Sequence, residues 1–219
     1  MKSIQSNIKK AKKYLDNNDC IAVPTETVYG LAGNAYSNVS IKKIYKLKKR
    51  PLNNPLIVHY HNLYQLKKDC DLNDNFLKLY KKLCPGPITF ILKKNSFSKV
   101  SKLATANKKT IAIRFPKHSI ARKLLKILKT PLAAPSANMS SKLSPTSALD
   151  VVDEFGKKIN FILDGGKCKI GLESTIIDLT DKPTILRQGS ITAEVIYKIL
   201  KKKNYIQKQI KKHYKSWAT

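Results

Sequence analysis

The stretch KKRPLNNPLIVH, Lys48 to His59, places three cations, two prolines and two carboxamides ahead of an apolar run. Pro51 and Pro55 fix their own φ angles and bias the residues before them toward extended conformations, so this backbone is stiff. Leu56-Ile57-Val58 is typical of a short buried strand. A rigid cationic loop beside a strand can bind a polyanion with little loss of entropy. The alternative interpretation is a Lys-rich surface turn.

Arginine is scarce in this chain, which makes its positions informative. Lys and Arg together number 43, but only four are arginine. A guanidinium can hold a phosphate or a carboxylate through two parallel hydrogen bonds, which an ammonium does poorly. Arg50, Arg114 and Arg187 lie in the segments KKRP, TIAIRFP and TILRQGS and are predicted to bind anions. Arg122 lies among lysines on a predicted helix and is expected to be solvated.

Composition limits the class of protein. A chain of 219 residues suits one large domain, or a domain with an appendage. Its four cysteines lack C-x-x-C spacing, so neither a zinc site nor a disulfide framework is indicated. The N-terminus is polar and no apolar run approaches a membrane span. We therefore expect a cytoplasmic protein with reduced thiols and no membrane segment.

The charge distribution has two explanations. A net charge of +29 predicts association with nucleic acid, but coding bias toward Lys, Asn, Ile and Tyr would produce the same value. Acidic residues are absent from 27–68 and from 75–149, which excludes a paired-carboxylate mechanism in those spans. Near the motifs stand only the acids Glu26, Asp164, Glu173 and Asp178. The predicted site is therefore poor in acids.

Apolar periodicity predicts alternating helices and strands. Helices are expected at 3–17, from Ser40 to before Pro51, from Asp71 or Asn73 to 83, at 118–128, from a Thr146 N-cap through 155, and at 192–203. Strands are expected at 20–23, 56–60, 88–92, 110–115, 131–137 and 159–166, followed by a strand pair at 171–179 and 183–189. Two hydroxyl-rich loops, 24–35 and 136–146, follow buried strands, so each is either a surface turn or part of a ligand site.

The chain has no Ser-His-Asp, Cys-His, Walker or dinucleotide signature. Arginines, lysines and hydroxyls at strand ends instead fit a nucleotide, with no covalent intermediate and no metal site built by the protein. Mg²⁺ would be held mainly through ATP phosphates, because carboxylates are scarce. Such a protein catalyses by positioning two substrates and neutralising charge on a phosphoryl group. Composition does not name the second substrate.

Six motifs, in this order, resemble the YrdC-domain family of L-threonylcarbamoyladenylate synthases: PTETVYGLAG, KKRPLNNPLIVH, TIAIRFP, SANMSSKLSPT, DGGKCKIGLESTIIDL and ILRQGSIT. The resemblance implies an α/β (α+β) fold, a twisted mixed sheet flanked by helices with a positively charged concave face. It implies the condensation of L-threonine, bicarbonate and ATP to threonylcarbamoyl-AMP and pyrophosphate, the first step of tRNA t⁶A37 modification. A downstream threonylcarbamoyl transferase complex would receive the product.

The resemblance also assigns residues to the two substrates. The residues expected around L-threonine are Thr25, His59, Arg114, Ser136 and Ser174. Those expected at ATP are Arg50, Asn54, Thr110, Asn138, Thr146, Arg187 and Tyr214. Lys48 and Arg50 are the expected catalytic residues, because they would stabilise charge at the α-phosphate and on the leaving pyrophosphate.

Two departures from the family pattern stand out. Relatives commonly have Gly where Ser141 stands, which bears on the backbone geometry of that loop. Residues 1–200 are expected to form the catalytic domain, and 201–219 a basic tail in which His213-Tyr214 looks like a remnant of an interdomain linker. That tail is interpreted either as a partial lid over the site or as a frayed end.

Two other functions stay open at this point. The first is a non-catalytic module that binds double-stranded RNA or tRNA through its basic surface. The second is a carbamoyl-adenylating enzyme of hydrogenase maturation, although the zinc-finger and acylphosphatase segments of that family are absent from this sequence. Omitting ATP, bicarbonate or L-threonine in turn while following pyrophosphate would separate all three functions.

Overall fold

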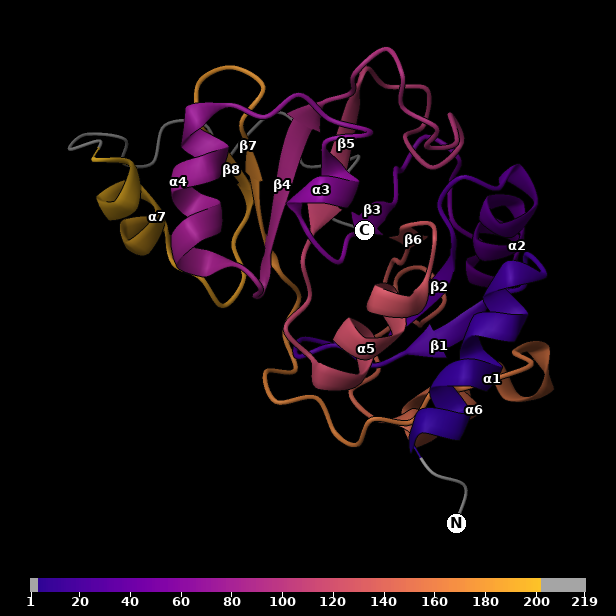
Figure 1. Ribbon diagram of the computed structural model, residues 1–219. Helices are drawn as coiled ribbons and strands as arrows, with labels where there is room; N and C mark the ends of the chain where they lie inside the picture. The colour runs from indigo at the N-terminus through magenta and orange to yellow at the C-terminus, as the bar shows by residue number, and fades with distance from the viewer. Residues whose placement is uncertain (1–3, 202–219) are drawn as a thin grey trace.

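A mixed sheet of eight strands forms the centre of the structure, a computed structural model that describes residues 4–201 (Figure 1). The strand order is β1-β2-β6-β3-β5-β4-β7-β8. The strands are β1 (Ile21–Val23), β2 (Gly30–Asn34), β3 (Ile57–His59), β4 (Ile88–Lys93), β5 (Thr110–Arg114), β6 (Leu132–Ala133), β7 (Thr175–Asp178) and β8 (Thr184–Arg187). Strand β3 pairs with β5 and β4 with β7 in parallel, and the other pairs are antiparallel. The predicted mixed α/β fold is confirmed.

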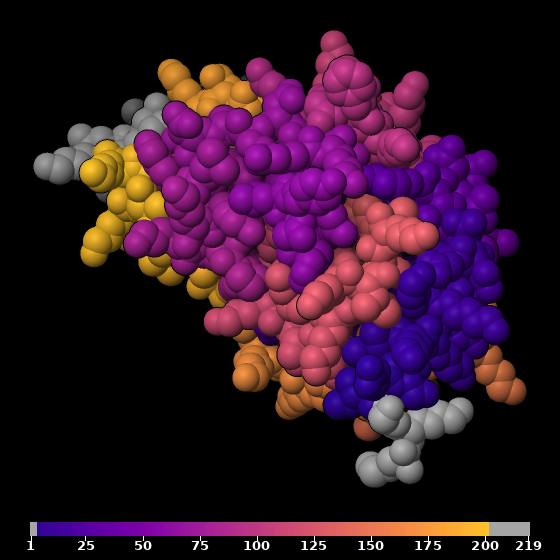
Figure 2. All heavy atoms as spheres, viewed as in Figure 1, coloured from indigo at the N-terminus to yellow at the C-terminus, as the bar shows by residue number. Residues whose placement is uncertain are grey.

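Helices of very different length pack on this sheet. They are α1 (Ile4–Asp16), α2 (Asn38–Lys48), α3 (Leu63–Leu66), α4 (Asp74–Leu83), α5 (Ser119–Ile127), α6 (Ala148–Phe155) and α7 (Ala193–Leu200). Helix α1 contacts α5, and α4 contacts α7, although each pair is far apart in the sequence. Figure 2 shows the first of these contacts on one face, where the indigo N-terminal residues lie beside the salmon residues of α5.

Alternation along the central strands gives the sheet two different faces. Ile111 and Ile113 of β5 belong to the large core, which also contains Phe76 and Leu79 of α4. Ala112, which lies between these two isoleucines, points to the other face of the sheet and belongs to a small separate cluster with Ile91 and Ile176. Arg114 lies on the same face as Ala112. Helices α2 and α4 therefore pack on the face of the large core. On the other face α1 and α5 pack on β1, β2 and β6. This second face is polar at β3 and β5, where His59 and Arg114 lie.

Several predicted boundaries need correction. Residues 159–166 form no strand, only an isolated bridge between Ala22 and Ile162. Helix α2 begins at Asn38 with Ser37 as its N-cap, not at Ser40, and the short helix α3 was not predicted. Helix α6 is capped by Ser147 instead of Thr146, because the Ser147 hydroxyl accepts the Asp150 N–H in a complete capping box.

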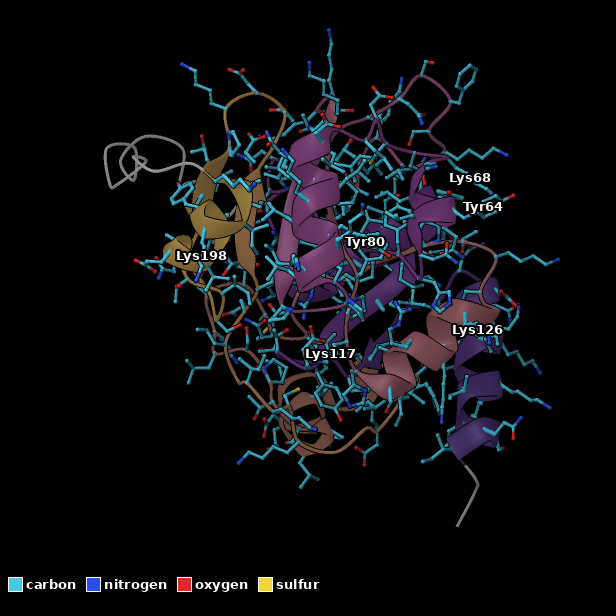
Figure 3. The ribbon with its side chains drawn as sticks, turned by 60° about the vertical axis from the view of Figure 1, so that its left-hand side comes forward. Tyr64, Lys68, Tyr80, Lys117, Lys126 and Lys198 are labelled. Atoms are coloured by element: carbon cyan, nitrogen blue, oxygen red, sulfur yellow. The ribbon has the colours of Figure 1, made fainter. Side chains whose placement is uncertain are left out.

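Arg122 is not simply solvated, because it is half-buried and its Nη1 donates to the His61 carbonyl at 2.7 Å. Lysines account for most of the exposed charge: Lys68, Lys126 and Lys198, labelled in Figure 3, are all exposed on the outer surface. No helix within residues 4–201 has the length and apolar character needed to cross a membrane. The predicted tail, residues 201–219 with Tyr214, lies outside the described residues except for Lys201.

Candidate active site

A cavity of about 370 Å³ opens on the polar face of the sheet. Strands β3 and β5 contribute His59 and Arg114, which are partners in the parallel register. The 136–146 loop contributes Ser136 and Asn138. The remaining predicted site residues that line the cavity are Thr25, Lys48, Arg50, Ser174 and Arg187. All three arginines singled out by their sequence context therefore share one cavity.

The loop that follows Arg50 is held in one conformation, as predicted from Pro51 and Pro55. Arg50 Nε donates to the Asn54 carbonyl at 3.1 Å, and Nη2 donates to the Pro55 carbonyl at 3.0 Å and to Asn54 Oδ1. These bonds fix the guanidinium across the six residues from Arg50 to Pro55. Burial, opposed by Tyr45 and assisted by the positive charge of Arg187, lowers the pKa of Arg50 to about 10. Arg50 thus stays cationic at neutral pH and lies within electrostatic reach of Arg187.

Lys48 lines the cavity but is almost fully buried, with 1% of its surface exposed. Its Nζ donates to the Ser136 carbonyl at 2.6 Å and to the Asn138 carbonyl, while its own carbonyl accepts the Ser140 N–H at 3.0 Å. Burial and the nearby Arg50 lower the pKa of Lys48 to about 7. Lys48 therefore anchors the 136–146 loop from both its side chain and its main chain.

Arg114 forms a buried ion pair that composition did not predict. Its Nη2 donates to Glu26 Oε1 at 2.8 Å, and the two side chains are 5% and 9% exposed. Its Nε has no hydrogen-bond partner among the described residues. Next to it His59 is neutral at neutral pH, because burial and the charge of Arg114 lower the pKa of His59 to about 3. The site is thus less poor in acids than predicted.

Ser174 and Arg187 are held together where β7 begins and β8 ends. Arg187 Nη2 donates to the Ser174 carbonyl at 3.0 Å, and the Ser174 and Thr89 hydroxyls are 2.7 Å apart. Gly189 permits this close approach, because a Cβ there would stand 2.3 Å from the Glu173 carbonyl. The two segments predicted as a strand pair therefore deliver one cation and one hydroxyl, both predicted site residues, to the same wall.

The predicted 24–35 loop needs correction, because its residues 30–34 form β2. The part before β2 is a compact turn closed by a hydroxyl. Thr25 Oγ1 donates to the Val28 carbonyl at 2.6 Å and accepts the Thr27 and Val28 N–H groups at 3.2 Å. Thr25 is thereby held against the cavity by its own backbone. Ser141, on the opposite loop, has φ +71°, which gives a physical reason for the Gly expected there.

Three predicted residues do not line the cavity. Asn54 is buried behind Arg50, which it orients. Thr110 begins β5 at the end opposite Arg114, although the two share one face of the strand. Thr146 instead donates to Asp150 Oδ2 through its N–H and its hydroxyl.

Sequence reasoning missed other cavity residues. Glu173 lines the cavity and accepts a hydrogen bond from the Ser144 hydroxyl, a contact that joins two loops about thirty residues apart in the sequence. Both residues stood inside quoted motifs, but nothing in their local pattern indicated that they would meet. Within residues 4–201, His, Cys, Asp and Glu side chains form no cluster of three or more that could hold a metal ion.

Comparison with known proteins gives a family and close relatives. The model of the Sua5/YciO/YrdC family, described as telomere recombination, matches residues 13–189. A threonylcarbamoyl-AMP synthase of Pyrococcus abyssi is 42% identical over 195 residues, covering 88% of this chain and 57% of the relative. A putative threonylcarbamoyl-AMP synthase of Methanocaldococcus jannaschii is 36% identical, and the match covers 84% of its length.

A crystal structure supports the same relationship. Pyrococcus abyssi Sua5 complexed with L-threonine superposes with a TM-score of 0.86 at 40% identity, over 91% of this chain and 58% of that one. Several relatives are therefore longer: the chain spans about half the length of the first curated proteins that it matches.

Proposed function

Because the chain belongs to the Sua5/YciO/YrdC family, we propose that it condenses L-threonine, bicarbonate and ATP to L-threonylcarbamoyladenylate with release of pyrophosphate. The reaction would be the first step of t⁶A37 modification of tRNA, with the product passed to a downstream transferase complex. One observation carries the proposal: Arg50, Arg187 and Arg114 line one cavity together with Ser174 and Thr25.

The amino acid would bind at the Arg114 end of the cavity. Arg114 suits a carboxylate, since its guanidinium lines the cavity and can offer planar donors to a ligand oxygen. The hydroxyls of Ser174 and Ser136 and the neutral imidazole of His59 can hydrogen-bond the other polar groups of L-threonine. Thr25 would contact the amino acid from its turn, whose backbone engages the Thr25 hydroxyl. The related Pyrococcus abyssi protein, crystallised with L-threonine, supports this choice of substrate.

ATP would place its phosphates at Arg50 and Arg187. Both guanidinium groups are fixed by hydrogen bonds to neutral oxygens of Asn54, Pro55 and Ser174. Cations fixed in advance stabilise charge as it develops, without reorganisation during the reaction. Lys48 would act chiefly by holding the Ser136–Asn138 backbone against the nucleotide.

The reaction itself needs positioning more than covalent help from the protein. The neutral α-amino group of threonine attacks CO₂ derived from bicarbonate, forming the carbamate N–C bond and losing a proton. A carbamate oxygen then attacks the α-phosphorus of ATP, and the bond from that phosphorus to the departing pyrophosphate oxygen breaks. The cationic cavity favours the neutral amine of threonine and stabilises the charge on the α-phosphate and on the departing pyrophosphate.

Mg²⁺ fits this arrangement only as a partner of ATP. Glu26 is engaged by Arg114, so Glu173 is the carboxylate that reaches the cavity. Phosphate oxygens would therefore supply most of the ligands, as is usual for Mg²⁺ in nucleotide sites. When bound, the ion would neutralise charge on the triphosphate.

The experiment is a pyrophosphate assay with ATP, Mg²⁺, bicarbonate and L-threonine, each omitted in turn. Wild-type protein should release pyrophosphate only from the complete mixture. Arg50→Ala should abolish that release, by about a thousandfold or more, because it removes a preorganised cation from the phosphoryl group. Arg122→Ala, a matched change outside the cavity, should retain activity. Pyrophosphate release that does not depend on threonine would refute the proposal.

The role of the tail is tested separately. Deleting 205–219, a segment outside the described residues, should raise the Michaelis constant for ATP if the tail closes over the site. An unchanged constant would leave residues 1–200 as the complete catalytic domain.

A further inference from the structure

We infer that Glu26 divides the cavity electrostatically and so reserves Arg114 for an amino-acid carboxylate while phosphate groups bind at Arg50 and Arg187. This inference rests on the proposed function and deepens it. Glu26 is a positioning residue that acts through Arg114, because its own side chain does not line the cavity.

Glu26 is held on every side by groups that fix its carboxylate. Oε1 accepts Arg114 Nη2 and Oε2 accepts the Lys117 N–H, both at 2.8 Å. The Glu26 carbonyl accepts the Ile170 N–H at 3.0 Å, which ties this residue to the loop leading to Ser174. Glu26 is 7% exposed, so solvent screens the pair weakly. The Nη2 group of Arg114 is thereby engaged by Glu26, and this contact fixes the orientation of the guanidinium.

The charge state of the pair follows from the same contacts. Burial alone raises the pKa of Glu26, but the Arg114 charge and hydrogen bonds from Arg114, from the Glu26 N–H and from Lys117 outweigh it and lower the pKa overall. Glu26 is consequently ionised at neutral pH. Arg114 and Glu26 together present a neutral pair, with the cation facing the cavity.

The other half of the cavity differs in charge. Arg50 and Arg187 are close enough that the charge of Arg187 lowers the pKa of Arg50. Two neighbouring cations attract a polyanion much more strongly than a neutral ion pair does. Free L-threonine at neutral pH is a zwitterion with no net charge, so it loses little by binding at the neutral pair and gains hydrogen bonds to the guanidinium of Arg114, which lines the cavity. Glu26 therefore prevents phosphate groups from competing for the amino-acid subsite.

The test uses inorganic phosphate as an inhibitor of threonine-dependent pyrophosphate release. In wild-type protein, phosphate should compete with ATP and not with L-threonine. In Glu26→Gln, which keeps the shape and removes the charge, phosphate should become competitive with L-threonine as well. The Michaelis constant for L-threonine should rise at least about tenfold, while that for ATP changes by less than about twofold.

Two further variants separate charge from structural damage. Glu26→Asp keeps the charge on a shorter side chain, so phosphate should stay non-competitive with L-threonine even where affinity falls. Asp69→Asn is the matched control: Asp69 is a fully buried carboxylate outside the cavity that accepts from Tyr36 at 2.8 Å and from Tyr60 at 2.9 Å. That variant should lose stability but keep the wild-type inhibition pattern.

Each outcome decides one point. Phosphate competing with L-threonine in the wild-type protein overturns the inference whether or not any variant folds. An unchanged pattern in a folded Glu26→Gln protein also overturns it, while wild-type turnover leaves the proposed function standing. Absence of threonine-dependent pyrophosphate from the wild-type protein overturns the proposed function itself.

Discussion

The three arginines that line the cavity, Arg50, Arg114 and Arg187, differ in the groups that hold their guanidinium in place. Arg50 is fixed by its own loop, Arg187 by the Ser174 carbonyl, and Arg114 by a buried carboxylate. Their hydrogen-bond partners therefore decide what each can bind. A lysine at any of the three positions would keep the charge and lose the planar set of donors that fixes its direction.

Ser141 is a residue whose backbone conflicts with its side chain. Its φ of +71° lies in the left-handed region, which costs a non-glycine residue about 1 kcal/mol. Ser141→Gly should therefore raise the free energy of unfolding by about 1 kcal/mol, measured by urea denaturation. Ser140→Gly is the adjacent control at an ordinary φ and should not stabilise. Equal effects of the two changes would argue against strain at Ser141.

Lys48 should make stability depend on pH. Its folded pKa of about 7 lies below the unfolded value near 10.5, so above about pH 7 the unfolded chain binds a proton that the folded chain lacks. The free energy of unfolding should rise between about pH 7 and 8.5, with a slope from this group approaching 1.4 kcal/mol per pH unit. Above that range the buried thiols act in the opposite sense, because burial raises their pKa values.

Lys48→Met supplies the comparison for that slope. Urea titrations at several pH values should show a flatter dependence in the variant than in the wild-type protein. Identical slopes would mean that the ammonium stays protonated through its bonds to the Ser136 and Asn138 carbonyls.

Among the elements, β5 explains how the fold builds a site. Its alternation sends Ile111 and Ile113 into the large core and leaves Ala112 and Arg114 on the opposite face. A shift of its pairing by one residue would turn the cation into the large core and the apolar side chains toward the cavity. The TIAIRFP pattern predicted the strand, and the alternation then follows from the period of a strand alone.

The N-cap of helix α6 was predicted at Thr146 but lies one residue later, at Ser147. Ser147 and Asp150 form the capping box, and Thr146 only assists by donating to Asp150. Ser147→Ala should lower the free energy of unfolding by about 1 kcal/mol, measured by urea denaturation. The control is Thr192→Ala at the start of α7, where the side chain makes no capping hydrogen bond and a smaller loss is expected. A larger loss at Thr192 would contradict this assignment.

For the whole molecule, charge is the dominant uncompensated feature. A net charge of +29 makes the folded chain repel itself, and counter-ions screen that repulsion. Added sodium chloride should therefore raise the thermal midpoint of unfolding over roughly 50 to 500 mM, as followed by calorimetry. Sodium sulfate at matched ionic strength controls for surface exclusion. A falling midpoint would show that ion pairs outweigh the general repulsion.

The same charge bears on the alternative function. Binding to double-stranded RNA or tRNA through phosphate contacts should weaken by at least about tenfold between roughly 50 and 200 mM salt. Threonine-dependent pyrophosphate release should fall far less over this range, because its cations are partly buried. RNA binding that survives high salt while no pyrophosphate forms would favour the binding module.

Local chemistry was enough to predict most of the strands, the stiff Arg50 loop and the importance of the rare arginines. Each depends on spacing along the chain or on the properties of single residues. The family was indicated by the resemblance of six motifs in order. Pairings between distant residues were not predictable in this way: Glu26 with Arg114, Glu173 with Ser144, and Lys48 with the Ser136 and Asn138 carbonyls. They form only when the sheet brings separate loops into contact, and burial then sets the charge and direction of each group.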